Sequence, residues 1–563
     1  MQRFSLKSTL AISASAAMLA SVMVTPAYAQ SSDGINPEDE IISIGTRRQA
    51  RSAADTPAPV DVISGVEFTG QASNDISDLL RVAVPSYNVN TQPISDAATL
   101  VRPANLRGLS PDNTLVLLNG KRRHRAAVIS FLGGGIADGA QGPDVSVFPA
   151  LALKQVEVLR DGASSQYGAD AIAGVVNFVL NDSAEGAAFT AKYGSTYEGD
   201  GDNLQFAANV GLPLGDVGFV NITGEWQETD GTFRSVQRDD ALALIAAGNT
   251  AVASIDVNTV TDEVVQYWGQ PDVEDDFKIF VNTGIDIGED AELYAFGNYA
   301  ERRATGGFFF RNPTNRGGVF QGPLVDPLTG AASSAADAVA SVLVGDETGD
   351  LSGGCPAGIP LTGTDGLIPD PTILASISAG GALDANCFSF VEVFPGGFTP
   401  RFGGDLTDFS IVGGFRGTLD IGTGLNYDLS GSIGENDAKF FISNTVNASL
   451  GSQSPTSFRP GDYTQTETRV GIDLSYDVAV DGWASDLTIA GGFEWREEEF
   501  EVTQGDPNSF NGPGDSVVTQ SLLQQGFLPG SNGFGGFGPT AAGTFDQSNI
   551  CLLYTSPSPR DRC

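Results

Sequence analysis

Residues 470–480 read VGIDLSYDVAV and contain the pattern from which the fold class can be inferred. Every second residue from Val470 onward is apolar, whereas Asp473 and Asp477 lie among the residues between them. Successive side chains of a β-strand point to opposite faces, so this alternation predicts a strand with one apolar and one polar face. Residues 425–435, which read LNYDLSGSIGE, repeat the pattern.

Segments of this kind recur along the chain after residue 181. Short turns, such as residues 288–290 and 420–424, alternate with long connections, such as residues 229–274 and 304–405. This alternation is typical of a transmembrane antiparallel β-barrel, whereas a soluble β-sandwich has no reason to show it. About nine strands are expected, at residues 189–197, 204–211, 218–228, 277–287, 293–302, 407–419, 425–435, 466–480 and 487–502.

The first 29 residues predict export from the cytoplasm. Arg3 and Lys7 precede an apolar run from Leu10 to Val24, and the small-residue site Ala27-Tyr28-Ala29 follows it. This order is typical of a cleaved secretory signal peptide. No later apolar run reaches the ~18–20 residues that a membrane helix needs. The mature chain is therefore expected either to remain free outside the cytoplasm or to cross a membrane as a closed barrel.

The charge is distributed unevenly along the chain. The 563 residues include 30 Lys and Arg against 69 Asp and Glu, which gives a net charge of −39. Residues 40–181 carry 12 basic and 13 acidic side chains, so almost all of the negative charge lies in later residues. Such an acidic chain repels nucleic acid, which is not expected as a partner. The change in composition predicts a linker at residues 30–55, a domain at residues 56–181 and a strand-rich region at residues 182–550.

The chain has no recognisable catalytic or metal-binding motif. His124 is the only histidine, which excludes a multi-histidine metal site and a nucleophile paired with a second histidine. No phosphate-binding loop or zinc-ligand spacing is present. We therefore expect no enzymatic activity, no cofactor and no bound metal.

Two cysteines are expected to form a disulfide. Cys355 and Cys387 lie 32 positions apart in the connection at residues 304–405. An exported chain folds in an oxidising compartment, where cysteines pair. The disulfide would order a connection that is otherwise too long to be structured.

Four motifs precede the strand-rich region. They read NLRG at residues 105–108, LVLLNGKR at 115–122, VEVLRDG at 156–162 and QYGADAIAGVVNFVL at 166–180. They describe short strands joined by tight glycine turns. Together, from about Glu40 to Leu180, they resemble the plug domain of a TonB-dependent outer-membrane receptor.

The resemblance implies an N-terminal α+β plug domain inside a transmembrane antiparallel β-barrel of 22 strands, in the outer membrane of a Gram-negative bacterium. It also implies energised import of a scarce ligand, bound by the outer loops and the plug apex. Ferric siderophore is the default ligand, and cobalamin, oligosaccharide and peptide remain open, because no loop sequence identifies one. The expected partners are the ligand, outer-membrane lipid, and the TonB protein with its inner-membrane complex.

TonB would pair with a short box near the N-terminus by β-strand addition, in which main-chain hydrogen bonds supply the affinity. The segment that fits this role is extended and rich in isoleucine. It consists of Glu40, Ile41, Ile42, Ser43, Ile44, Gly45 and Thr46.

The resemblance also suggests roles for charged plug residues. By this resemblance, Arg107, Glu157 and Arg160 match positions that contribute to a charged contact network between the plug and the barrel. A basic hairpin tip is expected either to seat the plug against carboxylates of the barrel lumen or to capture an anionic ligand at the plug apex. It comprises Lys121, Arg122, Arg123, His124 and Arg125.

The strand count disagrees with the family architecture. About nine strands are fewer than 22, and an odd number leaves the barrel unclosed, so the chain is expected to be truncated. The final residues, 551–563, read CLLYTSPSPRDRC, break the alternation and are expected to be a non-native tail. Two alternatives from other classes are a passive porin, which predicts no plug and no box, and a secreted β-rich binding module, which predicts an aqueous protein.

Overall fold

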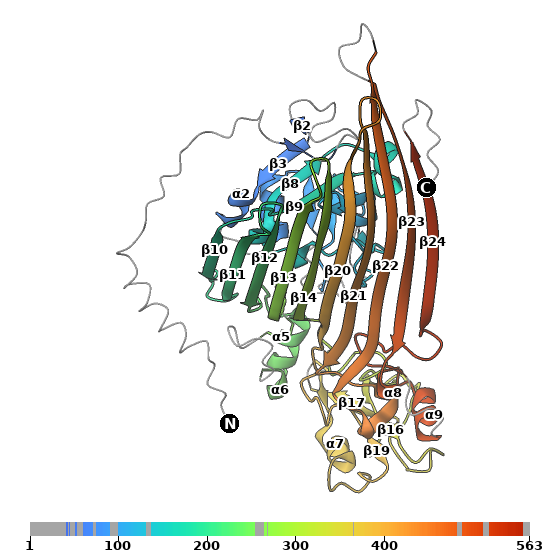
Figure 1. The fold of residues 1–563 in the computed structure, drawn as a ribbon. Coiled ribbons are helices and arrows are strands. Elements are labelled where there is room, and N and C mark those ends of the chain that lie inside the picture. The colour runs from blue at the N-terminus through green and yellow to red at the C-terminus, as the bar shows by residue number, and fades with distance from the viewer. Residues whose placement is uncertain are drawn as a thin grey trace.

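The computed structural model describes residues 41–42, 44, 51–52, 60–70, 75–89, 100–130, 137–253, 264–266, 268–363, 365–480, 487–510 and 517–554. A large curved sheet lies against a smaller N-terminal domain, and long connections gather at one end of its strands (Figure 1). The expected signal peptide lies outside the described residues. Among the helices of the described ranges, none combines the length and the apolar character needed to cross a membrane.

The N-terminal domain is built on a five-stranded sheet with the order β3-β8-β9-β6-β7. β6 and β9 run parallel, and the other neighbouring pairs are antiparallel. Helix α2 begins with a capping box in which Ser64 and Glu67 satisfy each other's backbone amides. The elements are β3 (Val60–Ser64), α2 (Gly65–Thr69), α3 (Ile76–Ala83), β4 (Tyr87–Val89), β5 (Ala104–Leu106), β6 (Thr114–Leu118), β7 (Lys121–Arg122), β8 (Leu153–Leu159), α4 (Ser164–Tyr167) and β9 (Gly174–Leu180).

The large sheet is a meander in which each strand pairs with the next along the sheet, always antiparallel. The expected arrangement of an N-terminal α+β domain beside a large antiparallel sheet is confirmed. The strands are β10 (Ala187–Gly194), β11 (Asn203–Pro213), β12 (Gly218–Thr229), β13 (Asp272–Asp286), β14 (Ala291–Gly306), β20 (Arg401–Leu419), β21 (Leu425–Ser443), β22 (Ser457–Val478), β23 (Leu487–Gln504) and β24 (Gly543–Tyr554).

In the described part of the chain the sheet has ten strands, one more than the alternation predicted. The additional strand is β24, which pairs with β23 from Gly543 opposite Val502 to Tyr554 opposite Gly491. Polar residues in the first half of β24, such as Gln547 and Ser548, hide the period of two. Residues 551–554 continue β24, and residues 555–563 lie outside the described residues, so the expectation of a non-native tail at residues 551–563 stays a prediction.

The two faces of the large sheet have opposite polarity. On β21, Leu429 and Ile433 each keep 43% of their surface exposed, whereas Asn436 on the other face is only 1% exposed. On β22, Val470 is 46% exposed, and Gln465 is 2% exposed. The outer face is thus apolar and uncovered, and the face toward the N-terminal domain is polar and buried. This arrangement is the reverse of a soluble protein and suits a wall between lipid and a polar lumen.

The long connection between β14 and β20 is structured, and with the β21–β22 and β23–β24 connections it forms an apolar cluster around Phe320, Phe390 and Phe527. Additional elements at this end of the sheet lie below the strands in Figure 1. They are α5 (Asp239–Ala246), α6 (Thr250–Ala253), β15 (Ser341–Leu343), β16 (Gly345–Asp346), β17 (Gly358–Thr362), β18 (Ile368–Pro369), α7 (Pro371–Ile377), β19 (Cys387–Phe388), α8 (Pro507–Phe510) and α9 (Val517–Gln524).

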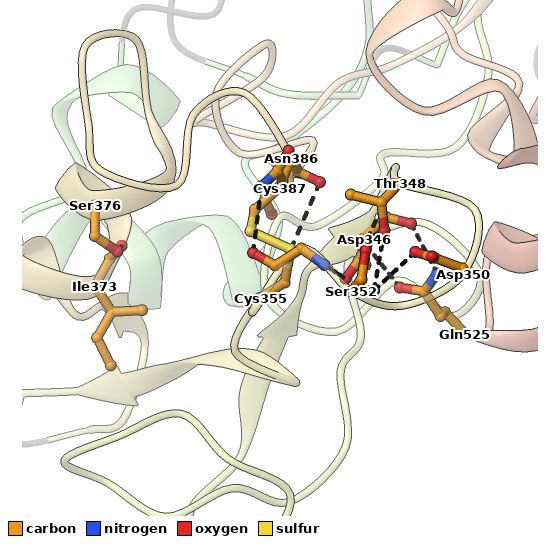
Figure 2. Close-up of a disulfide and its surroundings, with 12 residues drawn as sticks. Asp346, Thr348, Asp350, Ser352, Cys355, Ile373, Ser376, Asn386, Cys387 and Gln525 are labelled. Atoms are coloured by element: carbon orange, nitrogen blue, oxygen red, sulfur yellow. Dashed lines mark hydrogen bonds between the residues drawn. A yellow bond between two sulfur atoms is a disulfide. The ribbon is translucent and has the colours of Figure 1, made fainter.

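The predicted disulfide between Cys355 and Cys387 is present, with 5.5 Å between the two Cα atoms (Figure 2). Beside it, the Asp346 carboxylate accepts hydrogen bonds from the backbone amides of Thr348 and Gly353, both at 2.9 Å. The Gln525 side chain also binds the Asp346 backbone, accepting from its N–H at 2.7 Å and donating to its carbonyl at 3.1 Å. The disulfide therefore staples a connection that is also tied to the β23–β24 connection.

Candidate functional site: the interface between plug and sheet

The β6–β7 hairpin carries a row of cations to the polar face of the large sheet. Asn119 and Gly120 adopt φ angles of 48° and 76°, as the predicted tight turn requires. Lys121 Nζ then lies 2.9 Å from Asp428 Oδ2 on β21 and 3.8 Å from Asp473 Oδ2 on β22. Lys121, the first residue after the turn, is thus paired with carboxylates of two strands.

Two arginines of the same segment reach β23. Arg122 Nε lies 3.8 Å from Glu494 Oε1, and Arg125 Nε lies 3.1 Å from Glu498 Oε1. Arg122 also pairs with Asp170 of the plug. The guanidinium groups therefore bridge the two domains rather than pointing into open solvent.

A deeply buried part of the interface is centred on Asp408 of β20. Arg123 pairs with Asp408 and donates from Nη1 to Asn298 Oδ1 at 2.7 Å and to Ser410 Oγ at 2.6 Å. His124 Nε2 lies 3.0 Å from the second oxygen of Asp408. The Arg123, His124 and Asp408 side chains are 2%, 4% and 5% exposed. We call these three residues the Asp408 cluster.

Burial and the neighbouring Arg123 guanidinium lower the pKa of His124 below its usual value of 6.5, although Asp408 opposes both effects. His124 is therefore neutral at physiological pH and bonds to Asp408 without adding a charge. Within the described ranges, no group of three or more His, Cys, Asp or Glu side chains is arranged to hold a metal ion.

The geometry of Lys121 to Arg125 favours plug seating over ligand capture. The expected position at the plug apex is not supported, because among the described plug residues Leu100, Val101 and Ala126–Val128 lie closer to the long connections than Lys121 does. These pack against Phe308, Phe402 and Phe440. Lys121 lies instead near the short-turn ends of the strands, since its partner Asp428 is close to the start of β21.

Each of the three plug residues expected to contact the barrel has hydrogen-bond or ion-pair partners inside the plug. Arg160 Nε lies 2.6 Å from Asp61 Oδ2, because Arg160 follows β8, which pairs with β3. Arg107 Nη1 donates to the Arg160 carbonyl at 3.4 Å. Glu157 accepts hydrogen bonds from Gln155 at 2.8 Å and Asn177 at 3.0 Å. Their assignment as plug–barrel contacts is therefore not supported, and other residues bridge the domains.

Two of these bridges escaped sequence reasoning. Arg302 of β14 donates from Nη2 to Asp144 Oδ2 and to the Leu100 carbonyl, both at 2.6 Å. Gln141 Nε2 donates to Gln465 Oε1 of β22 at 2.9 Å. Arg302 could have been identified from its position in the alternating pattern, because its side chain lies on the same inward-facing side of β14 as those of Asn298 and Ala300.

The predicted TonB box is only partly described. Ile41–Ile42 forms β1 and pairs antiparallel with β2 (Arg51–Ser52). Ile44 is 1% exposed and packs in a cluster with Leu115 and Leu117 of β6. Glu40, Ser43, Gly45 and Thr46 lie outside the described residues.

Residues 52–175 match the family model described as TonB-dependent Receptor Plug Domain. This segment is a TonB-dependent receptor plug domain. The resemblance inferred from the four motifs is thereby confirmed. The plug domain accounts for β3 to α4 and for the interface with the large sheet.

A curated relative and two solved structures extend the comparison. The Probable TonB-dependent siderophore receptor PirA of Acinetobacter baumannii is 29% identical over 191 residues, which are 33% of this chain and 24% of PirA. The crystal structure of PirA has a TM-score of 0.46 at 16% identity and covers 91% of this chain and 55% of its own. A mutant ferric enterobactin receptor, PfeA, of Pseudomonas aeruginosa has a TM-score of 0.44 at 15% identity and covers 88% and 54%. The chain thus spans about a quarter of the curated relative and about half of these solved chains.

Proposed function

We propose that this chain belongs to an outer-membrane receptor that imports a scarce ligand with energy delivered by TonB. The observation that carries the proposal is a plug domain seated on the polar face of a sheet whose other face is apolar and uncovered. A passive pore needs no plug, and a soluble binding protein would bury the apolar face instead.

The ligand we propose is a ferric siderophore. The support comes from the curated relative, whose name describes a siderophore receptor, and the plug match. Cobalamin, an oligosaccharide and a peptide are the alternative ligands that the same import mechanism would serve. A competition experiment with these compounds would distinguish them.

We assign the TonB contact to Glu40–Thr46. An isoleucine-rich extended segment can add a strand to a partner through its main chain. In the structure Ile44 is held on the plug by Leu115 and Leu117, so a pull on this segment would act on β6. β6 leads directly into the cations that seat the plug.

Uptake of radiolabelled ferric siderophore by iron-starved cells tests the proposal. Ile42→Pro in the full-length receptor removes a main-chain donor, whereas Ile42→Val preserves it. We expect Ile42→Pro to abolish energised uptake and leave surface binding intact, and Ile42→Val to behave as the wild type. Uptake that survives Ile42→Pro would contradict the assignment of the box. Uptake that a protonophore does not reduce would instead indicate a passive pore.

A further inference from the structure

The only histidine of the chain fits against a position of the large sheet that has no side chain. Gly434 lies in the middle of β21, between Ser410 of β20 and Glu467 of β22. A Cβ atom added to Gly434 would overlap Nδ1 of His124, and it would lie only 2.5 Å from Cγ and 2.9 Å from Cβ of that residue. Carbon atoms that are not bonded normally approach to about 3.5–4.0 Å. The imidazole ring therefore occupies the space that a side chain at this position of the sheet would need.

The imidazole ring cannot turn away from Gly434 without losing its contact with Asp408. Its Nε2 lies 3.0 Å from Asp408 Oδ2, and the His124 side chain is only 4% exposed. Turning the ring would remove a hydrogen-bond partner from a buried carboxylate, which costs free energy. A void of about 10 Å³ borders both Gly434 and His124, but it is roughly the size of one water molecule and too small for the ring.

The backbone on both sides of His124 is also fixed. The Arg123 N–H donates to the Val116 carbonyl of β6 at 3.0 Å, and the Ala127 N–H donates to Asn436 Oδ1 of β21 at 2.7 Å. Two of the three atoms that would clash, Cβ and Cγ of the histidine, lie next to this backbone and not at the end of a flexible side chain. A side chain at position 434 would therefore displace the whole segment of the plug.

Two other glycines on the plug-facing side of the large sheet serve as comparisons. A Cβ atom on Gly404 of β20 would lie 2.8 Å from Leu100 Cδ1 of the plug, which is the end of a side chain that can rotate. A Cβ atom on Gly471 of β22 would have Ser430 Oγ at 3.5 Å and Arg469 Nη2 at 3.6 Å as its nearest neighbours. These are ordinary contacts within the sheet, so the glycine at 471 is not required by the plug.

We propose that Gly434 is the position of the large sheet that determines where the plug is seated, with the His124 ring as its counterpart on the plug. Lys121 and Arg122 do not select one position by themselves, because their side chains are long and can adapt to a displaced partner. A buried ring held between Asp408 and a bare strand backbone fits at one register only. This seating does not depend on import, whereas its effect on uptake rests on the proposed function.

Hydrogen exchange of the full-length receptor, followed by mass spectrometry of peptides that cover residues 121–128, tests the inference. We expect Gly434→Ala to speed exchange of this segment at least about tenfold, because a displaced segment loses the bonds that protect its amides. Gly471→Ala is the matched control and should leave exchange unchanged. Gly404→Ala should have a smaller effect than Gly434→Ala. Equal exchange in Gly434→Ala and the wild type would overturn the inference.

Removal of the ring separates the contact with His124 from the loss of the glycine itself. His124→Gly deletes the three atoms that a Cβ at position 434 would meet. In the His124→Gly background, Gly434→Ala should therefore change the exchange rate by less than about twofold. A tenfold effect of Gly434→Ala in both backgrounds would also overturn the inference, because the strand and not the plug would then require the glycine.

The same comparison remains possible if Gly434→Ala prevents assembly. The yield of folded receptor in the outer membrane then replaces the exchange rate as the measured quantity. His124→Gly combined with Gly434→Ala should assemble as well as His124→Gly alone. A double variant that assembles no better than Gly434→Ala would contradict the proposed seating.

Uptake of a radiolabelled ferric siderophore by the same variants shows whether import needs the seated plug. We expect Gly434→Ala to lose uptake and Gly471→Ala to keep it. Unchanged uptake by a Gly434→Ala receptor with fast exchange would contradict the link between seating and import. Absence of uptake by the wild type would contradict the proposed function and would leave the exchange result intact.

Discussion

Asp408 is the residue on which the seating of the plug depends most. Its carboxylate accepts hydrogen bonds from Arg123 and from Asn436, and His124 lies within hydrogen-bond distance. We expect Asp408→Asn to lower the free energy of unfolding by about 3–5 kcal/mol, because it leaves the Arg123 charge buried without its partner. Chemical denaturation measures this change, and protease cleavage of the plug reports how much of the protein has unfolded at each denaturant concentration.

Asp405 provides a matched control on the same strand. It pairs with Arg303 at 3.1 Å and Arg459 at 3.0 Å, and its side chain is 35% exposed. Exposed ion pairs contribute about 0–1 kcal/mol, so Asp405→Asn should change stability by no more than that. Equal effects of the two substitutions would refute the role of the Asp408 cluster.

His124 makes stability depend on pH in a defined direction. Burial and Arg123 depress its pKa in the folded protein from 6.5, against the effect of Asp408 and Asp144. Well above pH 6.5 the imidazole is neutral in both states and contributes no pH dependence. As the pH falls below this value, the unfolded chain takes up a proton that the folded chain excludes, so the free energy of unfolding decreases by at most about 1.4 kcal/mol per pH unit. Denaturation of wild type and His124→Gln between neutral and mildly acidic pH should show this slope only in the wild type.

Sequence reasoning identified the cations of the plug but not their partners. The basic run from Lys121 to Arg125 stands out in a nearly neutral domain. It can be recognised from the sequence because it is a local feature, a short motif that follows a glycine turn. Asp408, by contrast, lies 285 positions from Arg123, and the strand region contains many other carboxylates. Only the register of the strands selects one, and register cannot be read from a single sequence.

At the scale of elements, the β14–β20 connection depends on its disulfide. The two cysteines close a loop of 32 positions, for which chain entropy predicts about 3–4 kcal/mol of stabilisation. Replacing Cys355 and Cys387 together by serine should destabilise this connection and increase protease cleavage between residues 345 and 390. Cys551→Ser serves as the control, and an equal effect of that substitution would exclude the disulfide as the cause.

The outer face of β21 allows a test of membrane depth. Leu429 lies in the middle of the apolar stretch, whereas Leu425 begins the strand at the short turn. Arginine on the lipid face of a barrel costs about 2–4 kcal/mol at the midplane and about 0–1 near the interface. Leu429→Arg should therefore impair folding into lipid vesicles much more than Leu425→Arg. The same cost at both positions would argue against a lipid-facing surface.

The strands could be predicted well because their period of two is imposed by the difference between the two faces. Nine of the ten strands of the large sheet follow from it, and β14, β20 and β21 extend further toward the long connections than expected. β24 was missed because polar residues occupy both of its faces in the first half. The structured long connections were also missed, because their apolar cluster is assembled from three separate segments.

At the scale of the whole molecule, the two ends of the large sheet differ. The short turns lie at one end of the strands and the stapled connections at the other (Figure 1). If the chain crosses the outer membrane as proposed, the long connections face the exterior and the short turns face the periplasm.

Labelling of single cysteines on intact cells tests this orientation. Leu328→Cys, in a long connection, and Ile421→Cys, in the β20–β21 turn, replace residues that are 86% and 54% exposed. Both are introduced with Cys551→Ser and Cys563→Ser and treated with a membrane-impermeant maleimide. We predict that Leu328→Cys is labelled on intact cells and that Ile421→Cys is labelled only after the outer membrane is permeabilised. Equal labelling of both positions on intact cells would contradict the proposed membrane-spanning receptor.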